Sequence, residues 1–264
     1  SSLLLDPTQP AGTGESGSRL FRSWHSGTAK HEGVAEDYAN MIAAAIALWE
    51  AEATGDDYPI SISWGWLSQL EKHFKSPGGG FFQTRDEAAD IIVRCRPIYD
   101  NAVPPVNATM LANYARLHAM FGLSSDRFQI AAGAESMLEA LGGAAANATA
   151  AAAGFLIEFE LFVVPLAVSI FAPGSGSWPE AIPKLAPELT AVLRNCADPN
   201  LIVDWVSEAM SSYRDKAHPA YGRGAKDGKP TAYVCRGPVC SVPITDPEIF
   251  ARQLGALPGK SIPK

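Results

Sequence analysis

Apolar residues recur at helical spacing through the first 157 residues of the chain. Between residues 35 and 54, large apolar side chains are three or four positions apart, and Glu36 and Asp37 occupy the first turn. Carboxylates there suit the positive end of the helix dipole, so we predict a helix. The same spacing predicts helices at residues 62–74, 107–121 and 125–141. An alanine-rich run that ends near residue 157 is also predicted to be helical, because alanine loses no side-chain entropy in a helix.

The pattern changes after residue 157. Residues 161–171 form an uninterrupted apolar run rich in valine and isoleucine. Strands are predicted at residues 201–206 and 231–235, and helices at residues 183–193 and 246–254. Asp246 is the expected N-cap of the last helix, with Pro247 in its first position. The chain is therefore expected to contain a flexible tail, a helical part, a small α/β subdomain and a second tail, at residues 1–18, 19–157, 158–257 and 258–264.

Glycines and prolines punctuate the helical part. Three glycines at residues 78–80 make a turn, and residues 81–84 are predicted to be a short strand or hairpin arm. Prolines between residues 94 and 106 predict a loop.

The composition is globular and acidic. The chain has 21 Lys and Arg against 28 Asp and Glu, a formal net charge of −7. It lacks the excess of basic residues through which proteins bind nucleic acids and anionic lipids, so no nucleic-acid partner is expected. Residues 148–172 are apolar enough to suggest a membrane span, but Glu158 and Glu160 oppose insertion, and we interpret this stretch as buried core. No signal-peptide pattern is visible, so a soluble intracellular protein is expected and secretion is not supported.

Four cysteines are too few and too scattered for a disulfide-stapled fold. A Gly-Pro turn separates Cys235 from Cys240, so the two sulfurs could meet across a hairpin, either as buried thiols or as a disulfide. A zinc site would need two further ligands, and the five histidines show no metal-binding spacing. Phosphate-loop and serine-hydrolase motifs are absent too, so neither a metal nor a cofactor is predicted.

A series of short strings occurs in a fixed order along most of the chain. They are RLFRSW (19–24), EDYA (36–39), GGGFF (78–82), IVR (92–94), YDNAVP (99–104), Asn107, TAYVC (231–235) and CSVPITDP (240–247). Together they resemble the C-terminal half of the spermatogenesis-associated protein 20 family of thioredoxin-domain-containing proteins.

That resemblance implies a fold. Members of the family carry a thioredoxin-like domain followed by a toroid of helical hairpins, similar to N-acylglucosamine 2-epimerases and six-hairpin glycosidases. The fold implied here is mainly α: half of an (α/α) toroid over residues 19–157, followed by the α/β subdomain. The chain departs from the family where Pro105 and Val106 replace a small Ser-Gly pair, which fills space and restricts the backbone.

The toroid resemblance also implies a central cavity with polar residues at its rim. The candidate catalytic carboxylates, able to act as acid or base, are Glu36, Asp37 and Asp100. The candidate substrate-binding residues, with an aromatic face and two amides for a sugar ring, are Tyr99, Asn101 and Asn107. Structural alternatives stay open: Glu36 and Asp37 as acids that match the helix dipole, Asp100 as a turn organiser and Asn107 as a helix cap.

A closed double ring of about a dozen helices needs some ~250 residues, more than the helical part supplies. We therefore expect an open flank, covered by a missing N-terminal half or by another chain that contacts residues 19–49. The side chains expected to need covering are Phe21, Trp24, Ile42, Ile46 and Trp49. Two functions follow: the C-terminal part of a carbohydrate-related, six-hairpin glycosidase/epimerase-like protein of unknown substrate, or a non-catalytic docking or structural subunit of a larger assembly.

Overall fold

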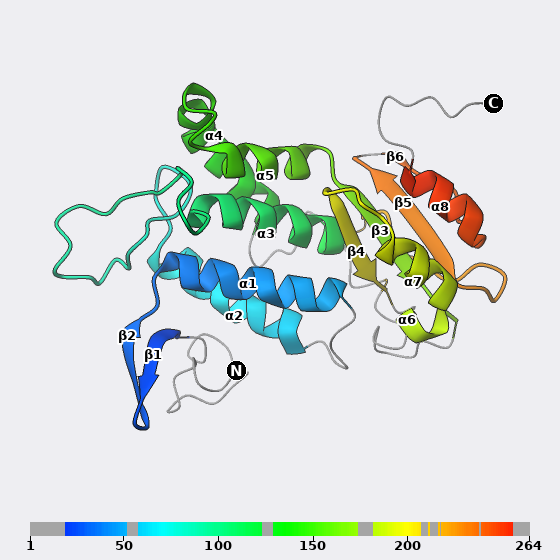
Figure 1. The fold of residues 1–264 in the computed structure, drawn as a ribbon, viewed down its shortest axis with the longest axis horizontal. Coiled ribbons are helices and arrows are strands. Elements are labelled where there is room, and N and C mark those ends of the chain that lie inside the picture. The colour runs from blue at the N-terminus through cyan, green and yellow to red at the C-terminus, as the bar shows by residue number, and fades with distance from the viewer. Residues whose placement is uncertain are drawn as a thin grey trace. The chain divides into compact units, whose positions relative to one another are not determined.

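The computed structural model describes residues 19–51, 58–122, 129–173, 182–206, 211, 216, 218–237 and 239–255. Within them, eight helices and two small sheets make a mixed α/β protein with substantial helix (Figure 1). The predicted tails at residues 1–18 and 258–264 lie outside the described residues. The chain divides into two compact units: Ser1–Trp49, Asp57–Ala115 and Phe128–Phe162 form the first, and Glu50–Asp56, Arg116–Arg127 and Val163–Lys264 form the second.

The first unit is a hairpin followed by helices. Its elements are β1 (Phe21–His25), β2 (Thr28–Glu32), α1 (Ala35–Glu50), α2 (Tyr58–His73), α3 (Val106–Phe121), α4 (Ile130–Asn147) and α5 (Ala153–Val163). The helices predicted at residues 35–54, 62–74, 107–121 and 125–141 are present with shifted boundaries. The alanine-rich run before residue 157 is only partly helical, because residues 148–152 form a turn between α4 and α5. Residues 81–84, predicted to be a short strand or hairpin arm, form no strand, but Phe81 makes an isolated antiparallel bridge with Lys75 and Phe82 N donates to Phe74 O across the glycine turn, as a short hairpin arm would.

The β1–β2 hairpin has no counterpart in the sequence predictions. Its two-residue turn is Ser26-Gly27, with φ values of 49° and 80°. Positive φ at both positions matches the twist of two antiparallel strands, and glycine adopts it at no steric cost. Trp24 pairs with Ala29 across this hairpin.

The core of the first unit forms around α1. The apolar stripe of this helix is buried, including Ile42, Ile46 and Trp49. Asn113 of α3 donates to Ala39 O at 2.9 Å, which holds α3 against α1. The neighbouring helices thus lie on the face that was expected to be an open flank.

The predicted open flank is accordingly wrong for most of its residues. Of the five side chains, three on α1 are buried, Phe21 is half-buried, and Trp24 is 41% exposed. The Tyr38 ring packs 5.4 Å from the ring of Phe74, just beyond α2, so the same stripe is also covered from that side. An apolar stripe at helical spacing shows only that a helix needs something packed against it. Here α2 and α3 of the same chain cover the stripe of α1.

The second unit is a four-stranded sheet with short helices. Its elements are β3 (Leu166–Phe171), α6 (Ile182–Leu185), α7 (Pro187–Arg194), β4 (Leu201–Trp205), β5 (Thr231–Arg236), β6 (Val239–Cys240) and α8 (Pro247–Gly255), with strand order β4-β3-β5-β6. β3 pairs parallel with β4 and antiparallel with β5, so Val168 lies between Val203 and Val234. This central strand is almost wholly buried, as its apolar run requires.

The last helix begins as predicted. Asp246 Oδ1 accepts hydrogen bonds from Glu248 N at 2.8 Å and Ile249 N at 3.0 Å, the geometry of an N-cap, and Pro247 occupies the first position. In the part of the chain that the structure describes, no helix has both the length and the apolar character needed to cross a lipid bilayer.

Candidate functional site

The first pair of candidate carboxylates lies in the first turn of α1. Asp37 Oδ2 accepts a hydrogen bond from Val34 N at 2.8 Å and lies 3.3 Å from Arg22 Nε. By reaching back to the residue before the helix, Asp37 supplies one half of a capping box. Glu36, one position earlier, is half-buried. The Asp37 carboxylate therefore fixes the start of the helix.

Asp100 holds the beginning of another helix. Its Oδ2 accepts from Gly154 N at 2.9 Å, and its backbone N donates to Ala151 O at 2.6 Å. Gly154 lies in the first turn of α5, where backbone N–H groups lack helical partners, so the carboxylate satisfies one of them. A Cβ on Gly154 would lie 2.6 Å from Asp100 Oδ1, which explains why glycine is needed for this close approach.

Asn107 is fully buried at the start of α3. Its Oδ1 accepts from Phe81 N at 2.7 Å, and its Nδ2 donates to Phe81 O at 3.0 Å and Pro97 O at 2.7 Å. Both amide hydrogens and the amide oxygen are thus used by the backbone. The preceding Pro105 and Val106 are buried too, so their side chains fill this region instead of leaving space for a ligand.

The remaining two candidate residues, Tyr99 and Asn101, lie at the surface. Tyr99 is 54% exposed, and Asn101 is an exposed residue whose Oδ1 accepts from the next backbone N–H at 2.9 Å. The described contacts of Asp37, Asp100 and Asn107 go to separate stretches of backbone and to an arginine. Of the structural alternatives considered from the sequence, only the helix-start role of Asp37 is observed. Asp100 bonds the start of α5 and not its own turn, and Asn107 bonds Phe81 and Pro97 and does not cap α3.

A cluster of ion pairs that the sequence did not reveal joins β2, the chain before β1 and the loop after α2. Arg19 lies 3.1 Å from Glu32 and 3.5 Å from Glu87. Arg85, only 7% exposed, lies 3.8 Å and 3.9 Å from the same two carboxylates, and its guanidinium stands over the Phe74 ring. We call these four charged residues the ion-pair cluster. Its members are too far apart in the sequence for any local pattern to group them.

Beside the ion-pair cluster lies a group with metal-ligand chemistry. Ligand atoms of His73, Asp86 and Glu87 lie within 4.8 Å of one another. His73 Nδ1 is 3.1 Å from Asp86 Oδ1; burial alone would raise the pKa of Asp86, but the hydrogen bond and charge of His73 outweigh it and lower that pKa. Since the guanidinium groups of Arg19 and Arg85 already neutralise Glu87, a dication here would meet two positive charges. The geometry therefore favours ion pairing over metal binding.

A buried polar group links α2 and α3. The Tyr114 hydroxyl donates to Glu71, and Lys75 donates to the other oxygen of the same carboxylate. Burial, reinforced by the Glu71 charge, raises the pKa of Tyr114 well above its ordinary value. Tyr114 is therefore a hydrogen-bond donor that fastens two helices and not a proton acceptor.

In the second unit, Glu50 and Arg116 form a mostly buried pair beside β4. Arg116 Nη1 lies 2.9 Å from Glu50 Oε1, and that oxygen also accepts from Val203 N at 3.2 Å. Burial raises the pKa of Glu50, against the lowering effect of the arginine and of the backbone bond. The pair supports β4, since Glu50 accepts from Val203 N and Arg116 donates to Leu201 O.

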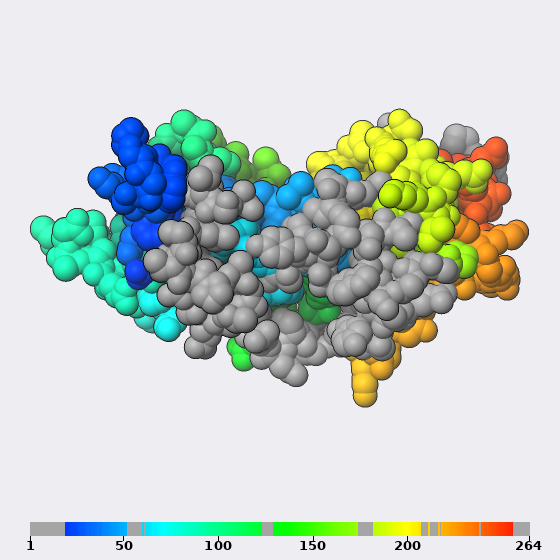
Figure 2. All heavy atoms as spheres, turned by 90° about the horizontal axis from the view of Figure 1, so that it is seen from below, coloured from blue at the N-terminus to red at the C-terminus, as the bar shows by residue number. Residues whose placement is uncertain are grey.

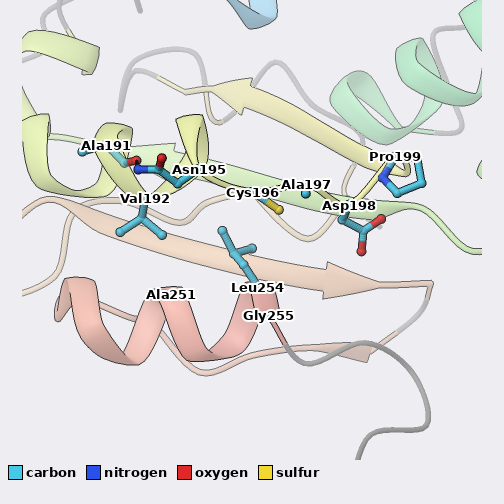
Figure 3. A pocket seen from close by; sticks show the side chains of 10 residues that line it. All are labelled: Ala191, Val192, Asn195, Cys196, Ala197, Asp198, Pro199, Ala251, Leu254 and Gly255. Atoms are coloured by element: carbon cyan, nitrogen blue, oxygen red, sulfur yellow. Dashed lines mark hydrogen bonds between the residues drawn. The ribbon is translucent and has the colours of Figure 1, made fainter.

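A hollow of about 570 Å³ lies between the last turns of α7 and α8 (Figure 3). Small apolar side chains form most of its wall, and its polar side chains are Asn195, Cys196 and Asp198. Asn195 Nδ2 donates to the backbone at 2.8 Å, and Asp198 pairs with Arg236 at 3.4 Å. Its size suits a small apolar ligand. Because the amide and the carboxylate support the loop, the hollow supplies no acid–base chemistry.

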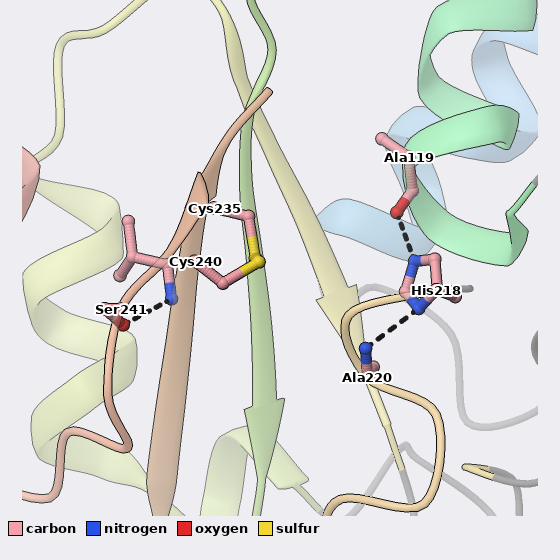
Figure 4. The surroundings of a disulfide bond; sticks show 7 residues. Ala119, His218, Ala220, Cys235, Cys240 and Ser241 are labelled. Carbon is pink, nitrogen blue, oxygen red and sulfur yellow. Dashed lines mark hydrogen bonds between the residues drawn. A yellow bond between two sulfur atoms is a disulfide. The ribbon is translucent and has the colours of Figure 1, made fainter. Parts of the chain in front are cut away.

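Cys235 and Cys240 face each other across β5 and β6 and form a disulfide (Figure 4). One of the two alternatives drawn from the sequence is therefore observed. His218 is engaged by backbone through both ring nitrogens, at 2.7 Å from Ala119 O and 3.1 Å from Ala220 N. It is thus not available as a ligand for a zinc site with these sulfurs.

No protein-family model matches the chain, and no curated protein matches it either.

Proposed function

We propose that this chain is a non-catalytic docking or structural subunit of a larger assembly, built on the helical fold of a six-hairpin glycosidase/epimerase-like toroid. One observation carries the proposal: the side chains of Asp37, Asp100 and Asn107 are hydrogen-bonded to backbone groups. A carboxylate that accepts from a backbone N–H at the start of a helix stabilises that helix, which is a structural role.

A docking role is supported by apolar side chains that the fold leaves in solvent. Ile92 is 99% exposed and the adjacent Val93 is 80% exposed. Adjacent apolar side chains that are this exposed are typical of surfaces that another chain covers.

The toroid relationship is part of the same proposal and concerns residues 19–157. Side-chain bonds from α3 to both α1 and α2 support a layered arrangement of hairpins, through Asn113 and Tyr114. A carbohydrate-related function of unknown substrate is the second candidate. It is favoured by the exposed ring of Tyr99, since an aromatic face can stack on a sugar.

Turnover of sugars tests the proposal. The full chain is incubated with N-acylhexosamines in D₂O and, separately, with aryl glycosides, and NMR follows deuterium at C2 and release of the aryl group. We expect no turnover, with the same result for Glu36→Gln, Asp100→Asn and the control Asp90→Asn. Turnover in the unaltered chain that Asp100→Asn or Glu36→Gln abolishes, and Asp90→Asn preserves, would overturn the proposal.

A further inference from the structure

The loop after α2 carries a projecting segment, residues 86–93, which we call the finger. Arg94 fixes its far end by donating to Thr84 O at 2.9 Å and to His73 O at 2.9 Å, while its guanidinium lies 4.3 Å from the Phe82 ring centre. Because the two ends of the loop are clamped together, the finger resembles an Ω-loop, a class of compact surface loops that often carry function.

The tip of the finger is apolar and its stem is acidic. Ile92 and Val93 are almost fully in solvent. Asp86, Glu87 and Asp90 are exposed before them, and residues 86–93 contain no basic residue. Asp86 pairs with His73, and Glu87 pairs with Arg19 and Arg85, so Asp90 is the acid that the finger offers to a partner beside its apolar side chains.

The β1–β2 hairpin has the opposite character. Residues 21–31 contain no acidic residue, and they expose Arg22, His25, Lys30 and His31. Trp24 among them is 41% exposed. Arg22 pairs with Asp37 within the chain, so Lys30 is the cation that matches Asp90 of the finger, and Trp24 matches its apolar side chains.

One arginine joins the finger to the hairpin. Arg19 contacts Glu32 at the end of the hairpin and Glu87 in the finger. Both project from the same end of the first unit, in blue and turquoise (Figures 1 and 2). Within one chain they do not cover each other, because Ile92 stays 99% exposed and Trp24 stays 41% exposed.

We propose that the finger of one chain docks on the β1–β2 hairpin of a second copy, and the reverse, in a two-fold symmetric dimer. This inference rests on the proposed docking function and names its surface and its partner. The finger and the hairpin lie beside each other on one chain, which suits an isologous contact. In a two-fold symmetric dimer the finger of each copy meets the hairpin of the other, so the same contact forms twice. An anionic membrane is a poorer partner, because the acidic stem is repelled by it.

Sedimentation velocity over a range from low micromolar to several hundred micromolar tests this dimer. We expect concentration-dependent dimerisation of the unaltered chain, and Ile92→Ser is expected to weaken it by about tenfold or more. Ile157→Ser, which removes an exposed apolar side chain from α5, is the matched control and should leave it unchanged.

A charge exchange adds a test that misfolding cannot imitate. Lys30→Glu and Asp90→Lys should each weaken dimerisation, and the double variant should restore it in part, because the interacting signs are reversed on both patches. A chain that stays monomeric throughout, or variants without effect on dimerisation, overturn the inference.

Two other results separate this inference from the proposed function. Binding of a monomeric chain to phosphatidylserine vesicles that Ile92→Ser abolishes would replace the second copy with a membrane and overturn the dimer. Sugar turnover by a chain that still dimerises through the finger would overturn the non-catalytic function while leaving the dimer intact.

Discussion

Replacing Asn107 with alanine separates a structural role of this residue from a ligand-binding one. The change removes one accepted and two donated hydrogen bonds at a site with no solvent exposure. A hydrogen bond contributes about 1 kcal/mol net, and a buried group left unpaired costs about 1–3 kcal/mol. The Phe81 N–H and the Pro97 carbonyl would both lose this partner. We therefore expect Asn107→Ala to lower the free energy of unfolding by about 3–5 kcal/mol.

Urea unfolding followed by circular dichroism measures this loss. Asn101→Ala is the control, because this exposed amide bonds only its neighbouring backbone N–H and should change stability by less than about 0.5 kcal/mol. If Asn107→Ala unfolds at the same urea concentration as the unaltered chain, the three bonds do not stabilise the fold, and the reasoning against a substrate-binding role fails.

Three further predictions concern the two units. Asp246→Ala removes the N-cap of α8 and should cost about 1 kcal/mol in urea unfolding. Gly79→Ala should cost about 2 kcal/mol or more in the same measurement, because φ is +91° and the added Cβ would lie 2.2 Å from Ser136 O. Burial raises the pKa of Glu50 in the folded chain above its ordinary value of 4.5. The folded chain therefore binds this proton more tightly than the unfolded chain does, and the free energy of unfolding falls as the pH rises from the unfolded pKa to the folded pKa. Glu50→Gln should remove that loss, measured as the pH dependence of the urea midpoint; an unchanged dependence would contradict the raised pKa.

The elements that could be predicted are those whose signal is local. The helix at α1 follows from its apolar stripe, and the start of α8 follows from Asp246 and Pro247, because a cap and its helix are only residues apart. The β1–β2 hairpin was missed although Ser26-Gly27 is a two-residue turn, since its strands are mostly exposed and lack the alternating apolar pattern.

The roles of the candidate site residues could not be predicted in this way, because their partners are remote. Asp100 bonds Gly154, and Asn107 bonds Phe81, across 54 and 26 positions. A carboxylate or an amide in a loop has the same chemistry whether it meets a ligand or a backbone group. Only the fold decides which of the two it contacts, and in both cases it is backbone.

The contacts of Asn107 also show the structural role of one string on which the proposed family resemblance rests. The GGGFF string and Asn107 form one structural element: a Cβ on Gly80 would lie 2.7 Å from Asn107 Oδ1, and the Phe81 ring stacks 6.3 Å from that of Tyr114. Because Gly80 has no side chain, the Asn107 amide fits beside it. The hydrogen bonds of Asn107 then hold Phe81 against Tyr114 of α3. Strings of this kind specify how helices join, so sharing them supports a shared scaffold far more than a shared reaction. In the described contacts Asp100 and Asn107 bond backbone groups, which is the condition that the proposed docking function requires.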